Sequence, residues 1–596
     1  MAPPPPPVAS AASSTSAPAT AAGAPRWARV ATLAELGGDG PHAATAAGHD
    51  VVVVRARGQL RVLDGRCPHQ GALLGEGELT DGRLVCRNHR WAFDPITGQR
   101  DGGSQCLRAC PTEVRGDELW ADVGGLATAA AAVATRRWDD LPGPRGLPVL
   151  GNAPQIDRQR LHLTLEAWSR EYGPTYRARF GRRKLIITRE PALIEQALRA
   201  RPDTFRRDGR VEPIFDELGI SGVFSAEGKD WRPQRRLAME ALSQKNLRGF
   251  YPTLRAVAER LRGRWQAAAE RGAAIDILDD LMRFTVDVTT SLVFGHDLDT
   301  VRGGHDVIQR HLEQFFPTIN RRLSSVVPWW RLFKSAADRR TDEALAALRS
   351  WLGELVVAAR ARLAADPARA ARPANFLEAM LAARDDAGRP FDDDVIFGNA
   401  VQMLLAGEDT TAYTLAWAVH HLCDAPAEVD ALRAELAAVT GGAAVPPDLD
   451  TANQLARATA IAQEAMRLRP VAPVVFVEPT QDVVVGDLAV PAGTSLVCLI
   501  RPNATDAAHF ADPSAFRPAR WIDEGPGAHD PSVHLPFGSG PRICPGRSLA
   551  LLEMRVVLAT LYGSFDVTRA GAADAVTEKF AFTVSPLGLR VRLQAR

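Results

Sequence analysis

Residues 537–546 read Phe-Gly-Ser-Gly-Pro-Arg-Ile-Cys-Pro-Gly and place a single cysteine, Cys544, in a glycine-rich loop. A helical pattern of apolar residues follows at 549–558. Glycines let the backbone approach a flat cofactor closely and leave main-chain amides free to point at a thiolate. The N-terminus of the following helix also favours an anionic sulfur. These features would suit a cysteine thiolate beside a planar cofactor, although a lone cysteine in a glycine-rich loop more often has no such role.

Polar motifs upstream of this loop lie within helical patterns. Glu464 and Arg467 are one helical turn apart, and by themselves they are an ordinary ion pair at positions i and i+3. Trp231 and Arg235 are four residues apart on another helix. Residues 406–411, Ala-Gly-Glu-Asp-Thr-Thr, interrupt a long apolar helix with glycine, acids and hydroxyls, in conflict with helix propensity. Such local conflicts often mark a functional site, although a polar, solvent-facing turn is the alternative.

Together these motifs resemble the cytochrome P450 family over about residues 139–596. The resemblance implies a mainly α fold with a minor β portion, and haem b bound through Cys544. It implies that Asp409 and Thr410 deliver protons during dioxygen activation. The side chains it implies near the haem propionates are Trp231, Arg235 and Arg542, and those it implies in a structural network on the haem side are Glu464, Arg467 and Arg520. One position departs from the pattern, because Val477 stands where the family often has another propionate-binding arginine.

Two Cys/His pairs lie near the N-terminus, Cys67-Pro68-His69 and, after 16 residues, Cys86-Arg87-Asn88-His89. Two cysteines and two histidines could hold tetrahedral zinc, but Cys-x-His is not a usual zinc spacing. The pattern resembles the Rieske family, which implies that Cys67 and Cys86 bind one iron of a 2Fe-2S cluster and that His69 and His89 bind the other.

Hydrogen-bond donors to the cluster are expected to be few. The positions that carry extra cysteines in high-potential Rieske proteins are Ala72 and Asn88 here, and Trp91 and Phe93 stand where hydroxyl groups would be. Fewer donors to the sulfurs stabilise the reduced cluster less. We expect a low-potential electron carrier.

The chain of 596 residues is expected to form two domains. Short alternating segments separated by glycine and aspartate turns predict a small all-β domain first, and amphipathic patterns predict a mainly helical domain after it. Helices are predicted at 161–172, 254–270, 344–363 and 392–422, and strands at 184–188 and 483–485. The predicted boundaries are 1–25 for a disordered tail, 26–123 for the Rieske domain, 124–138 for an Ala/Gly-rich linker and 139–596 for the P450 domain.

Composition excludes several classes of protein. A net charge of +1 suggests neither a nucleic-acid partner nor an anionic membrane surface. No apolar run is long enough to span a bilayer, and residues 1–25 lack the features of a signal peptide. Seven cysteines in a chain of this length do not form a disulfide framework. We therefore expect a cytoplasmic protein.

The expected function is a haem-thiolate monooxygenase that uses dioxygen to hydroxylate a small hydrophobic substrate. No flavin or nicotinamide fingerprint is found, so a separate NAD(P)H-dependent flavoprotein reductase is expected to supply electrons through the Rieske cluster. Candidate residues for the substrate pocket are Ala406, Val474, Val475 and Phe476. The alternatives are a haem-based redox or gas sensor without turnover and a Rieske non-haem oxygenase, against which the haem loop argues.

Overall fold

The computed structural model describes residues 25–37, 40–68, 71–87, 90–103, 105–124, 126, 134–303, 314–325, 327–384, 388–522 and 529–596. It divides into two compact units at about residue 130. Residues 1–24 of the predicted tail, residues 125 and 127–133 of the predicted linker, and the candidate ligands His69 and His89 lie outside the described residues.

The first unit is built from three small antiparallel sheets. Their strand orders are β1-β10-β9, β2-β3-β4-β8 and β5-β6-β7. The strands are β1 (Trp27–Thr32), β2 (His42–Ala46), β3 (His49–Ala56), β4 (Gln59–Asp64), β5 (Glu78–Thr80), β6 (Arg83–Val85), β7 (Ala92–Phe93), β8 (Ala109–Cys110), β9 (Thr112–Arg115) and β10 (Glu118–Asp122). Val51, Val53, Val62 and Leu119 are among the apolar side chains of its buried core.

Tight turns set the register of this unit. The hairpin between β3 and β4 turns at Arg57-Gly58 and the one between β5 and β6 at Asp81-Gly82, and all four residues have positive φ. Two-residue turns with positive φ at both positions match the right-handed twist of the flanking strands, and glycine adopts them without strain. These turns leave the longer loops that follow β4 and β6 to carry the cysteines.

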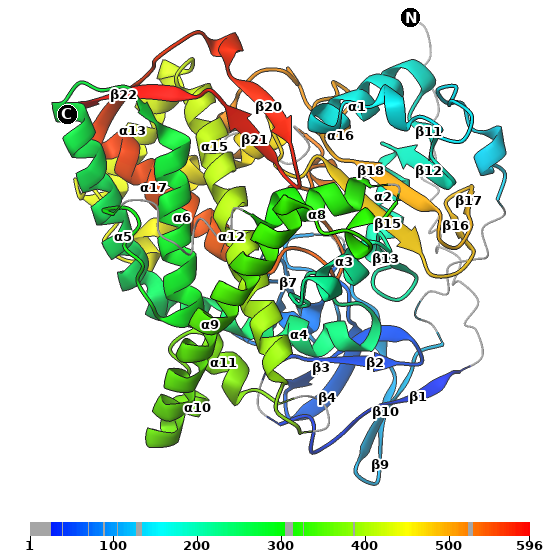
Figure 1. The fold of residues 1–596 in the computed structure, drawn as a ribbon. Coiled ribbons are helices and arrows are strands. Elements are labelled where there is room, and N and C mark those ends of the chain that lie inside the picture. Colours follow the sequence, from blue (N-terminus) through cyan, green and yellow to red (C-terminus); the bar gives the residue numbers. More distant parts are fainter. Residues whose placement is uncertain are drawn as a thin grey trace, which may run out of the picture. The chain divides into compact units, whose positions relative to one another are not determined.

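The second unit is mainly helical with a smaller β portion (Figure 1). Its helices of seven or more residues are α1 (Leu161–Tyr172), α2 (Pro191–Arg199), α3 (Val211–Glu217), α4 (Gly228–Ala241), α5 (Gln244–Glu270), α6 (Ile277–Phe294), α8 (Phe315–Ser324), α9 (Ala336–Ala365), α11 (Phe376–Ala382), α12 (Asp393–Leu422), α13 (Pro426–Thr440), α15 (Ala456–Leu468) and α17 (Arg547–Ser564). A five-stranded sheet has the order β11 (Thr175–Phe180), β12 (Arg183–Thr188), β18 (Ser495–Leu499), β15 (Val474–Pro479) and β13 (Phe205–Arg207). A hairpin of β20 (Thr577–Phe580) and β21 (Val584–Leu587) stands apart from that sheet. The predicted fold class, a small β unit followed by a mainly α unit with some sheet, is confirmed.

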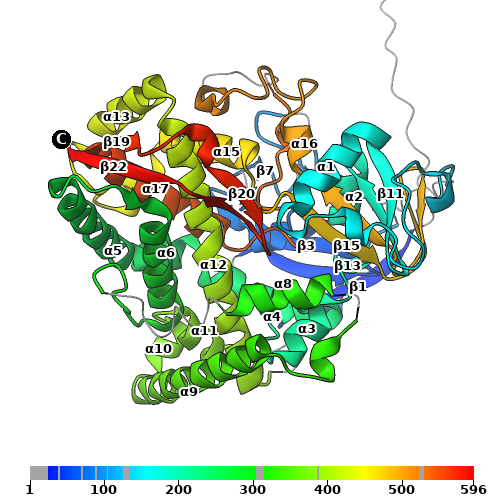
Figure 2. The same cartoon turned by 45° about the horizontal axis from the view of Figure 1, so that its top comes forward.

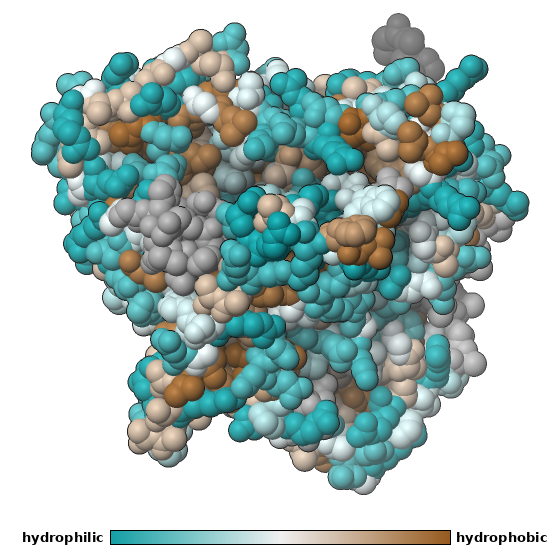
Figure 3. Space-filling view, viewed as in Figure 1, coloured by the Kyte–Doolittle hydropathy of each residue, from teal (hydrophilic) through white to brown (hydrophobic). Residues whose placement is uncertain are grey.

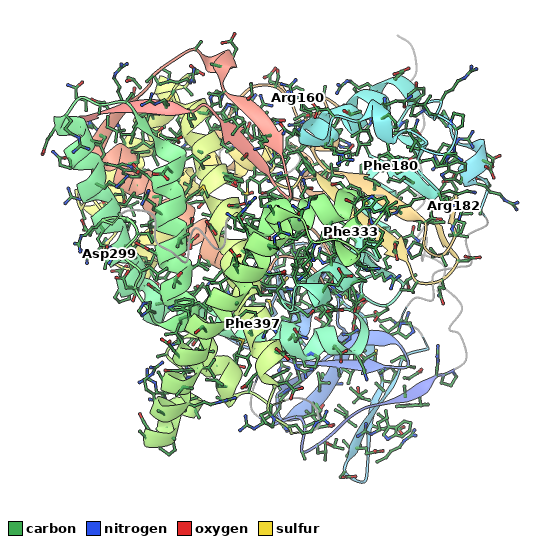
Figure 4. The ribbon with its side chains drawn as sticks, in the orientation of Figure 1. Arg160, Phe180, Arg182, Asp299, Phe333 and Phe397 are labelled. Atoms are coloured by element: carbon green, nitrogen blue, oxygen red, sulfur yellow. The ribbon has the colours of Figure 1, made fainter. Side chains whose placement is uncertain are left out.

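Helix α12 is the central element of the second unit, and Figures 1 and 2 both show it crossing that unit beside α6. It also packs against α15 and α17. Most of its 30 residues are buried, as expected for a helix that is apolar on all sides. Figure 4 labels Phe397 near its beginning, where the Arg349 guanidinium of α9 lies 4.2 Å from the ring centroid. The helix is mostly buried from Ile396 onward and carries residues 406–411 into the interior of the unit.

No helix among the described residues combines the length and the apolar character needed to cross a membrane. On the face shown in Figure 3, hydrophobic residues form separate patches among hydrophilic ones. Among its described residues, the loop between α8 and α9 carries four large exposed apolar side chains, Val327, Trp329, Leu332 and Phe333.

Candidate functional site

The loop that carries Cys544 is closed by its own backbone. The Cys544 amide donates to the Phe537 carbonyl at 2.9 Å, and the Ile543 amide donates to the Gly540 carbonyl at 3.1 Å. Gly540 has a φ of +73°, and a β-carbon there would lie 2.3 Å from the Leu198 carbonyl oxygen, so only glycine fits. Helix α17 begins at Arg547, three residues after the cysteine.

The Cys544 sulfur faces an enclosed space. The residue is exposed, and yet burial is the main influence on its thiol and raises the pKa. A side chain can be both exposed and desolvated only if it faces a hollow that protein surrounds. The amides of Gly546 and Arg547, at the start of α17, donate to the sulfur and favour the thiolate. The sulfur is thus presented to the hollow.

Arginines gather beside this loop. The Arg235 Nη1 donates to the Ile543 carbonyl at 2.7 Å, and the Arg542 guanidinium lies 4.4 Å from the ring centroid of Trp231. The structure thus brings the three predicted propionate-binding residues together around the Cys544 loop. Two further arginines, Arg201 and Arg207, lie here although no sequence motif indicated them. Each interacts electrostatically with Arg542.

Among the described residues, Arg201 and Arg542 of this cluster have buried nitrogens without hydrogen-bond partners. Glu227 accepts from the Arg542 Nη2 at 2.5 Å and from the Arg207 amide at 3.0 Å. Even so, two nitrogens of Arg542 and two of Arg201 are buried with no hydrogen-bond partner among the described residues. Burial lowers the pKa of Arg542 to about 9 and that of Arg201 to about 10. Buried guanidinium groups require paired anions, so Arg201 and Arg542 would suit the two propionates of a haem.

The departure at Val477 has a structural counterpart. Val477 lies in β15 directly opposite Arg207 in β13, and residues that face each other across two strands project to the same side of the sheet. Burial lowers the pKa of Arg207 well below its usual value, and Cys544 is among the groups that act on it electrostatically. Arg207 therefore places a cation opposite Val477, the position at which this sequence lacks the arginine that the family often has. No spacing rule could have found it, because the pairing of β13 with β15 joins segments about 270 residues apart.

Glu464 is the centre of a fully buried network. Its carboxylate accepts from the Arg467 Nε and Nη2 at 2.9 and 2.8 Å and from the Arg520 Nε at 3.0 Å. The Arg517 amide and the Trp521 Nε1 add two more bonds at 2.9 Å each. Burial alone would raise the pKa of Glu464, but the arginines outweigh it and lower the pKa. The structure brings these residues together as predicted, and all three charged side chains are completely buried.

Residues 406–411 interrupt the buried surface of α12. Ala406 is exposed although residues 400–405 are buried, which indicates that this face borders a hollow. The Thr410 hydroxyl donates to the Ala406 carbonyl at 2.9 Å, and Asp409 is buried. The predicted lining residues Val474, Val475 and Phe476 of β15 are half-buried. The solvent-facing alternative for this turn is thus not what the structure shows, because α12 lies inside the unit.

Helix α6 supports the same turn of α12 from behind. The Thr285 hydroxyl lies 2.8 Å from the Glu408 carbonyl oxygen and can donate to it. A β-carbon on Gly407 would lie 2.6 Å from the Thr289 hydroxyl, which explains the glycine in this motif. The turn therefore carries glycine because another helix packs directly against it.

A buried acid that lies outside every sequence motif joins α17 to α12. Glu553 is only 2% exposed, and Thr411 is its hydrogen-bond partner. Burial raises the pKa of Glu553 to about 8, so the acid is neutral over most of the physiological range. The helix that follows Cys544 is thereby tied to the helix that carries Asp409 and Thr410.

In the first unit, both predicted cysteine ligands are buried at the base of short loops. Cys67 and Cys86 are each 1% exposed. A bridge between Arg66 and Leu73 closes the first loop, and the Cys86 amide donates to the Trp91 carbonyl at 2.8 Å in the second. Buried thiols at two closed loops suit a metal cluster.

The aromatic residues beside the second loop are packed firmly. Phe93 is completely buried, and the Arg100 guanidinium lies 3.5 Å from the ring centroid of Trp91. Ala72 is buried, whereas Asn88 lies outside the described residues.

Comparison with known proteins matches both units. The family model "Cytochrome P450" matches residues 141–592, and the model "Rieske [2Fe-2S] domain" matches residues 26–111. The human mitochondrial 25-hydroxyvitamin D-1 alpha hydroxylase is 29% identical over 486 residues, which cover 76% of this chain and 92% of that protein. Protein LUTEIN DEFICIENT 5, chloroplastic, from Arabidopsis thaliana is 25% identical, covering 71% of this chain and 72% of that protein.

A third relative is longer than this chain. The self-sufficient cytochrome P450 monooxygenase CYP505E4 of Penicillium expansum is 27% identical over 77% of this chain, but the match covers only 43% of that protein. The P450 model spans most of the chain, and the chemistry of that family and of the Rieske domain implies a haem and a 2Fe-2S cluster as cofactors. The chain therefore belongs to the cytochrome P450 family of haem-dependent oxidoreductases and carries a Rieske [2Fe-2S] domain ahead of its P450 domain.

Proposed function

We propose that this P450 monooxygenase hydroxylates a small hydrophobic substrate and receives its electrons through its own Rieske cluster. The observation that carries the proposal is the Cys544 sulfur, which faces an enclosed space beside Arg201 and Arg542, whose buried nitrogens lack partners among the described residues. A haem held there would supply a redox-active iron that activates dioxygen. The remaining work falls to side chains of this chain.

Each motif has a proposed task. Arg201, Arg207, Arg235 and Arg542, with Trp231, hold the propionates. Glu464, Arg467 and Arg520 support the haem side of the fold without touching the substrate. Asp409 and Thr410 move protons to the reaction site, with the Thr410 hydroxyl held at the Ala406 carbonyl between transfers. Ala406, Val474, Val475 and Phe476 exclude water and contact the substrate.

The electron route is proposed from the domain order. Cys67, Cys86, His69 and His89 would hold the 2Fe-2S cluster, and a cluster within the same chain is present at a higher effective concentration than a diffusing carrier. Neither matched region is a flavoprotein, so a separate NAD(P)H-dependent flavoprotein reductase is the proposed donor. Cys106, Cys110, Cys423 and Cys498 are free thiols, which suits a reducing compartment such as the cytoplasm.

Substitution of the proposed iron ligand tests the haem site. Cys544→Ala is expected to abolish the red-shifted Soret band of the reduced carbonyl complex, because that band requires a thiolate ligand. Cys423→Ala is the matched control, since Cys423 is a half-buried thiol at the end of α12 and is expected to leave the band intact. Survival of the band in Cys544→Ala would refute the ligand assignment.

Turnover tests the rest of the proposal. The purified chain with substrate and NAD(P)H is expected to be inactive until a flavoprotein reductase is added, and then to form hydroxylated product. A Cys67→Ser variant should keep the carbonyl band but lose this activity. Turnover without any reductase would contradict the proposed partner, and ligand-dependent spectra without product under any donor would favour a haem-based sensor.

A further inference from the structure

Three phenylalanine rings from separate elements of the second unit meet. Phe582, in the turn between β20 and β21, lies 5.4 Å from Phe316 of α8 with nearly parallel rings. It lies 5.7 Å from Phe224, in the loop between α3 and α4, with the rings edge to face. Figures 1 and 2 both show the β20–β21 hairpin reaching the region of α8. All three rings are half-buried, so each keeps part of its surface open.

The Phe224 backbone is hydrogen-bonded to helix α12 and to one arginine of the cluster beside Cys544. Its amide donates to the Gln402 Oε1 at 2.8 Å, and its carbonyl accepts from the Arg207 Nε at 2.6 Å. The Arg207 guanidinium also lies 3.7 Å from the ring centroid of Phe224. The arginine opposite Val477 therefore holds Phe224 by a hydrogen bond and by a cation–π contact.

Helical spacing places this cluster beside the substrate side of α12. Gln402, Ala406 and Thr410 are successive residues four apart, so they share one face of the helix. Ala406 is exposed on that face and Thr410 is half-buried. The bond from Phe224 to Gln402 therefore puts the three rings at one end of the stripe that carries the proton-delivery threonine.

We propose that Phe224, Phe316 and Phe582 form the end wall of the substrate pocket and select compact, uncharged molecules built on rigid rings over extended alkyl chains. This inference rests on the proposed function and deepens it. Aromatic rings have few rotamers, and rings packed face-to-face and edge-to-face hold one another in place. A wall made this way limits the length of the pocket, while its open ring faces favour flat apolar guests.

Charge at the wall favours the same class of substrate. The cation that contacts Phe224, Arg207, is directed at the ring and carbonyl of that residue and belongs to the arginine cluster proposed to hold the propionates. A fatty-acid carboxylate would have to compete for it. A neutral ring system requires no counter-charge and loses less conformational entropy on binding than a flexible chain does.

Two neutral imidazoles test the wall, since both bind ferric haem and shift its Soret band. 1-Phenylimidazole is compact, and 1-dodecylimidazole is extended. We expect Phe582→Ala to tighten the dodecyl ligand about tenfold relative to the phenyl ligand, a gain that corresponds to about two more buried methylene groups. Phe580→Ala is the matched control, because Phe580 lies in the same hairpin but stacks on His162 at 5.7 Å.

The possible results distinguish a failure of the proposed aromatic wall from a failure of the proposed haem site. If Phe582→Ala does not retain haem, then Phe582→Leu and Phe316→Leu are expected to shift the ratio of the two dissociation constants in the same direction. A ratio that stays within about twofold of the wild-type value, in variants with an intact carbonyl band, overturns the wall. A wild-type Soret band that responds to neither imidazole refutes the haem site itself, and the wall with it.

Discussion

The substitution Glu464→Gln removes one negative charge from a network that water does not reach. Glu464, Arg467 and Arg520 are all completely buried, and five donors converge on the Glu464 carboxylate. Glutamine keeps the shape of the side chain but turns an NH2 group toward N–H donors. Both guanidinium groups would then lose their shared counter-charge in the interior.

Breaking a buried ion pair by removing one partner costs about 3–5 kcal/mol. An unfolding entropy of about 2.1 cal/mol/K per residue, over the helical unit, converts this loss into a fall of about 3–5 °C in Tm. The assay is thermal unfolding of wild type and variant at matched haem content, with the carbonyl band as a second readout. Haem occupancy is expected to fall as well, because the network supports the haem side of the fold.

The matched control is Asp450→Asn. Asp450 makes a two-bond ion pair with Arg248, with nitrogen–oxygen distances of 2.6 and 2.7 Å, but both side chains are about 60% exposed. Solvent screens that pair, so its loss should leave the Tm unchanged. A Glu464→Gln protein whose Tm and haem content equal those of wild type would show that the buried network does not stabilise this fold.

Further substitutions probe other parts of the chain. Glu553→Gln tests the neutral acid: the folded-state pKa is raised from 4.5 to about 8, so wild-type stability falls with rising pH across that window by up to about 1.4 kcal/mol per unit. The Tm of the variant, which cannot ionise, should increasingly exceed that of wild type from about pH 6 to pH 8, and a constant gap would contradict the shifted pKa. Thr410→Ala should lower product per NAD(P)H and raise peroxide, whereas Thr414→Ala, one turn further along α12, should not; equal coupling in both would remove Thr410 from proton delivery. Trp91→Tyr should raise the midpoint potential of the cluster in an EPR-monitored titration, and an already high wild-type potential would refute the expected low-potential carrier.

Periodicity predicted some elements closely and missed others for physical reasons. The pattern at 161–172 coincides with α1, and that at 392–422 differs from α12 by one residue. Helix α5 begins ten residues before the predicted start because it continues through Pro252, which normally ends a helix. Helix α6 was not predicted at all. Five of its six residues at 285–290 are β-branched and favour a strand, but burial between α5 and α12 makes this segment helical.

The predicted site residues are those that belong to local motifs, and the missed ones depend on distant contacts. The Cys544 loop and the Glu464–Arg467 pair can be recognised within ten residues of sequence. Arg207 and Glu553 cannot, because their surroundings are set by strand pairing and helix packing between segments far apart in the chain. A charge or an acid acquires its role only when the fold determines what surrounds it.

The arginines around the Cys544 loop have a consequence for how the protein acquires its cofactor. Glu227 accepts from Arg542, and yet two nitrogens of Arg542 and two of Arg201 are buried without partners among the described residues. The haem propionates would act there as counter-ions, so cofactor insertion and consolidation of the fold should be one coupled event. Haem would then stabilise the helical unit in addition to supplying its chemistry. Small dianions such as phosphate should partly substitute for it and protect the apoprotein from thermal unfolding.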